Sequence, residues 1–208
     1  MEINLLEKME KLSKKGRDFR SFINFEIRAV QDSDNKEALY VEGVACSFNQ
    51  PTVLFEYDGI EYKEQVDDRA FDEADMSDVI FNYNHGGKVM ARTRNKTLQL
   101  MVEKDGLHIK ARLDGTEEGR KLYEEIKGGY IDRMSYAYTV KEAAWDQENH
   151  MRTIRKIKKL YDVSAVDIPV YDTTSISARS LLELEKEERE KLDSLNERKK
   201  RLALLTQL

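Results

Sequence analysis

The chain contains 208 residues, of which 40% are hydrophobic and 36% are charged. This length and composition favour one domain with a sizeable core over two independent domains. Its 35 basic and 40 acidic residues give a formal net charge of -5 and no large single-sign field, so nucleic acid is not an expected partner.

The N-terminal segment has the periodicity of a helix. Between residues 2 and 15, apolar side chains recur at helical spacing among lysines and glutamates: Ile3, Leu5, Leu6, Met9 and Leu12. The interspersed acids leave no continuous apolar stretch of the signal-peptide kind, and no run approaches the roughly 20 apolar residues of a membrane helix. We therefore expect a soluble, intracellular protein without membrane contact, in which residues 1–18 form an amphipathic helical extension.

From residue 20 to residue 113 the pattern changes to short strands separated by polar or glycine-containing turns. Repeated short strands indicate a barrel or a sandwich. The one cysteine, Cys46, lies in an alternating strand pattern, where burial as a small hydrophobic residue is expected. Strands are predicted at 22–30, 38–48, 53–62, 79–83, 98–103 and 107–113, with a short helix at 69–74.

A capped helix and two further strands follow. Thr116 can cap a helix over 117–126, and the glycine pair 128–129 ends it. The strands are predicted at 134–141 and 154–168.

The final segment, 180–208, is rich in Glu, Lys and Arg and contains neither proline nor glycine, which predicts a long helix. Its leucines fall on heptad positions that charged residues interrupt, so a coiled coil and a solvated helical tail are both open. The chain therefore divides into an N-terminal extension (1–18), a core domain (19–179) and a charged tail (180–208).

Three separated strand-like segments each carry one reactive side chain: His85, Ser135 and Asp162. A serine hydroxyl needs a base to remove its proton as it attacks a carbonyl, and a third group orients that base and stabilises its charged form. A histidine, a serine and an acid in this order are candidate parts of an acyl-transfer site, provided that the fold brings them together.

The local sequence around each residue fits this role. His85 precedes Gly86 and Gly87, which allow a sharp chain exit and an exposed ring. Ser135 alternates with large residues, so it lies on a strand face of small side chains that can admit a substrate or a closely packed histidine. A carboxylate at Asp162, inside an apolar run, needs a partner if it is buried, and a histidine Nδ1 proton is a suitable one.

Each residue also has a structural alternative. His85 can be a strand-end histidine bonded to the next turn, and Ser135 can serve tight sheet packing, since it lacks the glycine-flanked nucleophile elbow. Asp167, on the opposite face of the same strand, competes with Asp162 for the third place. One of the two acids can instead pair with a lysine at 156, 158 or 159.

The two other histidines, His108 and His150, read as surface residues. No cysteine cluster and no pair of histidines at ligand spacing occurs, so neither a metal nor another cofactor is expected.

The three segments and the landmarks around them resemble the prohead maturation proteases of tailed bacteriophages, a family that shares its fold with the herpesvirus capsid maturation protease. The resemblance runs from about Phe22 to Arg179 and depends on the order and spacing of short fragments. In chain order these are Glu64-Gln65-Val66, Ala70-Phe71, Asn84-His85, Gly106-Leu107, Met134 to Tyr138, Leu160 to Val166 and Pro169-Val170-Tyr171.

The strand pattern and the resemblance together predict an α+β fold: a mainly antiparallel β-barrel core with peripheral helices, extended by the N-terminal helix and the long C-terminal helix. The resemblance implies that His85 is the general base, Ser135 the nucleophile and Asp162 the orienting acid. In the herpesvirus branch a second histidine takes the third place.

The activity that the resemblance implies is that of a serine endopeptidase. Its substrates would be segments of the phage scaffold and major capsid proteins, with self-cleavage, inside the assembling prohead in the host cytoplasm. Self-association is a further expectation, because the related herpesvirus enzymes work as dimers.

The chain departs from the family pattern in places. Gly86 stands where many relatives have an aspartate, and Tyr136-Ala137-Tyr138 stands where the phage pattern commonly reads Phe-Gly-Phe. The herpesvirus enzymes supply an arginine near the oxyanion from the segment that corresponds to 169–171, where this chain has none. We therefore expect backbone NH groups of that turn, or a residue elsewhere, to stabilise the tetrahedral intermediate.

Two non-enzymatic functions are the alternatives. In the first, a protease-like barrel with two helices acts only as a capsid assembly or scaffolding protein. In the second, the barrel is a binding module for peptide or nucleic acid, with Tyr136 and Tyr138 as its contact surface.

Overall fold

A computed structural model describes residues 18–31, 38–57 and 59–167, together with Ser194 and Arg198. The predicted N-terminal helix lies outside the described residues. Of the predicted C-terminal helix only Ser194 and Arg198 are described, and both are helical. All other described residues belong to the compact unit Arg17–Asp172. Within the described ranges, no helix has the length and apolar character needed to cross a bilayer.

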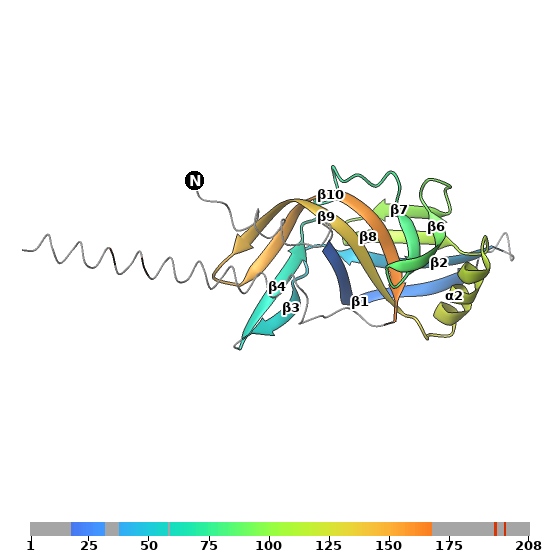
Figure 1. Cartoon of the computed structure of the whole chain (residues 1–208), viewed down its shortest axis with the longest axis horizontal. Helices are drawn as coiled ribbons and strands as arrows, with labels where there is room; N and C mark the ends of the chain where they lie inside the picture. The colour runs from blue at the N-terminus through green and yellow to red at the C-terminus, as the bar shows by residue number, and fades with distance from the viewer. Residues whose placement is uncertain (1–17, 32–37, 58, 168–193, 195–197, 199–208) are drawn as a thin grey trace, which may run out of the picture. The chain divides into compact units, whose positions relative to one another are not determined.

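Between residues 18 and 167, the described chain is mostly β-sheet with one helix, which agrees with the α+β class (Figure 1). The helix, α2 (Glu117–Lys127), separates the first eight strands from the last two. The strands are β1 (Asp18–Gln31), β2 (Leu39–Ser47), β3 (Thr52–Tyr57), β4 (Ile60–Val66), β5 (Ile80–Tyr83), β6 (Gly86–Arg92), β7 (Leu98–Val102), β8 (Gly106–Arg112), β9 (Arg133–Asp146) and β10 (Met151–Val166).

The strands form a ten-stranded sheet with the order β3-β4-β10-β9-β1-β2-β8-β7, from which β5 and β6 branch. Most neighbours are antiparallel, but β10 runs parallel to β4 and to β5. The predicted closed barrel is not found in the described strands, because no pairing joins β3 to β7. The edge of β10 that faces away from β9 is shared by β4 and β5, so the ladder branches there.

The longest pairing joins β9 to β10, which Figure 1 shows as two curved strands side by side. Both strands extend beyond their predicted limits toward their common turn. The sequence signal there is weak because Ala143 and Ala144 have low strand propensity, yet they pair with Ile154 and Thr153. The Asp146 carboxylate holds the turn by accepting hydrogen bonds from three N–H groups of the loop.

Two local predictions in the first half were wrong, and one strand was missed. The single strand predicted at 53–62 is the hairpin of β3 and β4, because Gly59, with φ of 75°, permits a two-residue turn between Tyr57 and Ile60. The helix predicted at 69–74 is instead a series of turns closed by bonds between residues three apart. The strand β6 was not predicted at all.

Helix α2 occupies the predicted position, and its ends have the expected caps. The Thr116 side chain accepts a hydrogen bond from the Gly119 backbone N–H, and the Gly128 N–H bonds back to the last turn. Acidic residues in the first turn and Lys127 in the last complement the helix dipole. The buried face carries Leu122, Tyr123 and Ile126.

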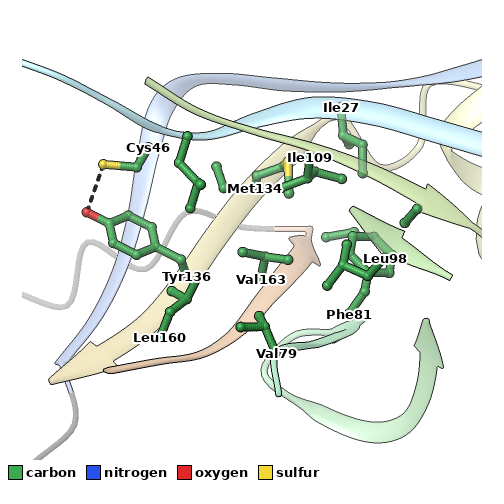
Figure 2. Packing of buried hydrophobic residues seen from close by; sticks show 14 of the residues in the cluster. Ile27, Cys46, Val79, Phe81, Leu98, Ile109, Met134, Tyr136, Leu160 and Val163 are labelled. Atoms are coloured by element: carbon green, nitrogen blue, oxygen red, sulfur yellow. Dashed lines mark hydrogen bonds between the residues drawn. The ribbon is translucent and has the colours of Figure 1, made fainter. Parts of the chain in front are cut away.

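The core is built from buried apolar side chains of several strands, among them Phe81 of β5, Ile109 of β8, Met134 of β9 and Val163 of β10 (Figure 2). Burying one such Phe, Leu or Ile side chain stabilises the fold by roughly 1.5–3 kcal/mol. Tyr136 and Tyr138 of β9 belong to this core: both are completely buried, and their rings stack with centroids 5.0 Å apart. They therefore do not form the contact surface that the binding-module hypothesis requires.

One set of buried polar groups forms a connected series that begins at Tyr138. Tyr138 donates its hydroxyl proton to Glu64 Oε1, and Arg152 Nη1 donates to Glu64 Oε2 at 3.0 Å. Glu64 of β4 and Arg152 of β10 are neighbours in the parallel ladder, so the pairing of the strands places the two charges together. A buried carboxylate needs such partners, since its desolvation is otherwise strongly unfavourable.

Cys46 lies at the other end of the tyrosine pair. It is completely buried, as predicted, and its Sγ donates to the Tyr136 hydroxyl at 3.3 Å (Figure 2). Burial raises the pKa of the Cys46 thiol to about 12, which outweighs the lowering effect of the hydrogen bond that the Tyr136 hydroxyl can donate to the thiolate. The thiolate, which is the reactive form, is therefore suppressed at neutral pH.

We predict that Cys46 of the native protein does not react with a disulfide reagent such as DTNB at pH 8 on the time scale of minutes. In guanidinium chloride the same sample should release one thiol per chain, since the sequence has one cysteine. Rapid labelling of the native protein would show that the thiol is accessible and would contradict this packing.

Candidate active site

His85 lies in the tight turn between β5 and β6. Tyr83 pairs with Gly86, which leaves Asn84 and His85 as the two turn residues, and both have positive φ, 48° and 54°. This is the geometry of a type I′ hairpin turn, which asparagine and histidine tolerate better than most residues that carry a side chain. The turn is thus made by Asn84 and His85 themselves, whereas the predicted exit residues, Gly86 and Gly87, begin β6.

Three adjacent strands bring polar side chains into one row beside this turn. Ser164 of β10 pairs with Asn82 of β5 on one side and with Ser135 of β9 on the other. Directly paired residues of neighbouring strands project from the same face of a sheet, and so do residues two apart on one strand. Asp162 therefore shares this face with Ser164, next to the row.

The His85 ring contacts two members of this group through different nitrogens. Its Nε2 lies 2.5 Å from Ser135 Oγ, and its Nδ1 lies 2.6 Å from Asp162 Oδ1. The side chains of His85 and Asp162 are 11% and 8% exposed, and Ser135 is completely buried. The fold thus brings together all three residues that the sequence analysis singled out.

The two contacts fix the proton positions that suit base chemistry. An ionised carboxylate only accepts hydrogen bonds, so the proton between His85 and Asp162 belongs to Nδ1. Nε2 then carries a lone pair and accepts the hydrogen bond from the Ser135 hydroxyl. In this arrangement the ring can remove the Ser135 proton, and the Asp162 carboxylate can stabilise the imidazolium that forms.

Two further polar residues of the cluster were not identified from the sequence. Ser164 Oγ lies 2.8 Å from Asp162 Oδ1 and 3.1 Å from His85 Nδ1, and it also hydrogen-bonds the Asn82 side chain. Both residues are buried. Ser164 could have been identified from its spacing, because a residue two positions after Asp162 on the same strand shares its face. Asn82 could not, because its position depends on the parallel pairing of β5 with β10.

Asp167, the competing acid, has a different partner. Its Oδ2 accepts a hydrogen bond from the Tyr83 hydroxyl at 2.9 Å, and this bond raises the pKa of Tyr83. The lysine alternative also fails for Asp162, because its carboxylate contacts His85 and Ser164 and none of the lysines at 156, 158 and 159 pairs with it.

The other two histidines lie away from this cluster, His150 in the turn between β9 and β10 and His108 on strand β8. His150 packs its ring against Tyr62, and His108 pairs at 2.9 Å with Asp105, which lies in the turn between β7 and β8. Within the described ranges, Glu103, Asp105 and His108 are the group whose side chains could share a metal ion, with ligand atoms within 4.8 Å of one another. They do not belong to the cluster around His85. The segment expected to supply oxyanion donors, 169–171, lies outside the described residues.

Comparison with known proteins gives one family. Residues 24–188 match the family model described as caudovirus prohead serine protease. Among solved structures, the bacteriophage T4 capsid assembly protease, gp21, is similar over 72% of this chain and 96% of that chain, with a TM-score of 0.45 and 14% sequence identity. A search of curated proteins gives no match.

The turn that carries His85 should be sensitive to residue type. We predict that Asn84→Val lowers the free energy of unfolding by about 1–3 kcal/mol, because a β-branched residue is strained at positive φ. The matched change Asn84→Gly should cost less, since glycine adopts this conformation freely. Urea denaturation of the three proteins measures the difference, and equal stability of the Val and Gly variants would contradict the turn geometry.

Proposed function

The chain belongs to the caudovirus prohead serine protease family, and from this premise we propose that it acts in capsid maturation by peptide hydrolysis at Ser135, His85 and Asp162. The observation that carries the assignment is the His85 ring, which hydrogen-bonds Ser135 through Nε2 and Asp162 through Nδ1. A base that is oriented on one side and bonded to a hydroxyl on the other is the arrangement that activates a serine.

The first half of the reaction forms an acyl-enzyme. Ser135 Oγ attacks the carbonyl carbon of the scissile peptide bond while His85 Nε2 takes the hydroxyl proton, which gives a tetrahedral intermediate and an imidazolium. Asp162 stabilises the imidazolium through Nδ1–H. The Nε2 proton then passes to the amide nitrogen, the C–N bond breaks and the amine product leaves.

The second half repeats these steps with water. His85 Nε2 removes a proton from a water molecule as its oxygen attacks the ester carbonyl of the acyl-enzyme. The Ser135 oxygen leaves with the proton returned from Nε2, and the carboxylic acid product is released. The donors that stabilise the oxyanion in both halves are expected from the turn at 169–171 or from a residue elsewhere.

Access to Ser135 is a requirement of this proposal. Ser135 is completely buried and the His85 side chain is only 11% exposed, so a peptide carbonyl reaches Oγ only if the protein around the site rearranges. Movement of a segment on substrate binding is common in enzymes and can also delay activity until the substrate is in place.

The family gives the proposal its substrates and its setting. We take the substrates to be segments of the phage scaffold and major capsid proteins, together with the chain itself, cleaved inside the assembling prohead in the host cytoplasm. Residues 19–179 would be the protease domain, and the extensions 1–18 and 180–208 would mediate recruitment or self-association. No role for nucleic acid, a membrane, a metal or another cofactor enters this mechanism.

The direct test is co-expression with the capsid and scaffold proteins of the same phage, followed by intact mass measurement of every product. The wild-type chain should yield defined fragments, and Ser135→Ala should reduce the cleavage rate by a factor on the order of 10⁴ or more while the fold is retained. Equal cleavage by both proteins would remove Ser135 from the mechanism. Capsid assembly without cleavage by either protein would favour the scaffolding alternative.

Asp162, on β10, and Asp167, directly after this strand, provide a matched comparison. Asp162→Asn should lower kcat by about 10⁴-fold, because an amide can hold the His85 ring in the tautomer that cannot accept the serine proton. Asp167→Asn should leave kcat near the wild-type value, since that side chain contacts Tyr83. Initial rates on one cleaved substrate measure both effects, and the reverse order would assign the third place to Asp167.

A further inference from the structure

We propose that Ser164 is a positioning residue of this site, which holds the Asp162 carboxylate and the Nδ1 edge of His85 so that Nε2 stays directed at Ser135. The inference rests on the proposed function, because it assigns a role within the same catalytic cluster. It concerns a residue that does not touch the substrate and acts only through Asp162 and His85.

The contacts of Ser164 converge on the acid and base. Its Oγ lies 2.8 Å from Asp162 Oδ1 and 3.1 Å from His85 Nδ1, while Asp162 Oδ1 and His85 Nδ1 are 2.6 Å apart. The three atoms therefore form a closed triangle with every side at hydrogen-bond distance. Ser164 is completely buried and Asp162 is 6% exposed, so water does not readily replace these bonds.

The proton count in the triangle explains what Ser164 contributes. The Ser164 hydroxyl and the Nδ1–H of His85 can both donate to the Asp162 carboxylate. Hydrogen bonds to an ionised acceptor are stronger than neutral ones, and two of them restrict rotation of the carboxylate more than one does. An Asp162 side chain held in this way keeps the Nδ1 proton in place and leaves the Nε2 lone pair for Ser135.

Asn82, the direct partner of Ser164 on β5, is also in contact with the Ser164 side chain. The Ser164 hydroxyl also reaches Asn82 Oδ1, but it carries one proton and can donate to one acceptor at a time. The charged Asp162 carboxylate is the stronger acceptor of the two. Because Asn82, Ser164 and Ser135 are paired across β5, β10 and β9, the sheet itself sets the spacing between the positioning residue and the nucleophile.

The same geometry argues against Ser164 as a second nucleophile. Ser164 contacts Nδ1, whereas Ser135 contacts Nε2. For His85 to remove the Ser164 proton, Nδ1 would have to carry a lone pair. That lone pair would then face the Asp162 oxygen at 2.6 Å with no proton between them, which is repulsive.

The experiment compares two serine-to-alanine variants in the full-length chain. Ser164→Ala should lower kcat by about 10- to 100-fold, the effect of losing one charge-assisted hydrogen bond, and should leave KM unchanged. Ser77→Ala is the matched control. Ser77 also donates to an aspartate two residues before it, Asp75 Oδ1 at 2.6 Å, but it lies in an exposed turn outside the site, so kcat should not change.

A spectroscopic measurement separates positioning from a general effect on folding. In the wild-type protein labelled with ¹⁵N-histidine, His85 should be in the Nδ1–H tautomer, and Ser164→Ala should increase the Nε2–H fraction. If Ser164→Ala does not fold, Ser164→Thr and Ser164→Val replace it. These two side chains are nearly isosteric, and only threonine retains the hydroxyl, so kcat should be at least about tenfold higher for threonine.

Unchanged kcat in Ser164→Ala, or equal kcat in the Thr and Val variants, would overturn the proposal. These outcomes are distinct from failure of the proposed function. If the proposed function is wrong, the Ser135→Ala variant still cleaves the substrate. The His85 tautomer tests the role of Ser164 whether or not the protein cleaves its substrate, because the spectrum is recorded without turnover.

Discussion

The pairing of β10 with strands on both of its edges is the constraint on which the rest of the structure depends. On one edge β9 places Ser135 opposite Ser164, and on the other β5 places Asn82 beside the same residue. The short turn after β5 then returns His85 over the row. Residues from three distant parts of the sequence therefore meet through backbone hydrogen bonds, and the registers of the two ladders set the distances between their side chains.

The same strands build the core with their alternate residues. On β10, Val163 and Ala165 pack in the core while Asp162 and Ser164 form the cluster, and on β9 Met134 and Tyr136 lie on the other side of Ser135. A slip of one residue in either ladder would move polar groups into the core and apolar groups into the site. Core packing thus stabilises the register that brings Ser135, His85 and Asp162 together, since a misregistered sheet loses apolar burial and leaves polar groups without partners.

The sequence predicted the parts that depend on local pattern. The alternation of large and small residues around Ser135 and the capping residues of α2 are local features, and both have the expected structure. The open ladder, the parallel pairing of β10, and the contacts of Asn82 and Ser164 depend on which strands meet, and alternation does not encode this. The turn at Asn84 and His85 was missed for a different reason: Gly86 and Gly87 are stronger turn formers, but the register of β5 with β6 places the turn before them.

The most direct test of this account is to identify which serine the site activates. A fluorophosphonate reagent should be added to a preparation that cleaves its substrate, and the modified peptide should be mapped by mass spectrometry. The account predicts one adduct, on Ser135, that is absent from a folded His85→Ala variant because Nε2 no longer takes the hydroxyl proton. An adduct on Ser164, or equal modification of Ser135 without His85, would contradict the assignment of Ser135 and His85 as nucleophile and base.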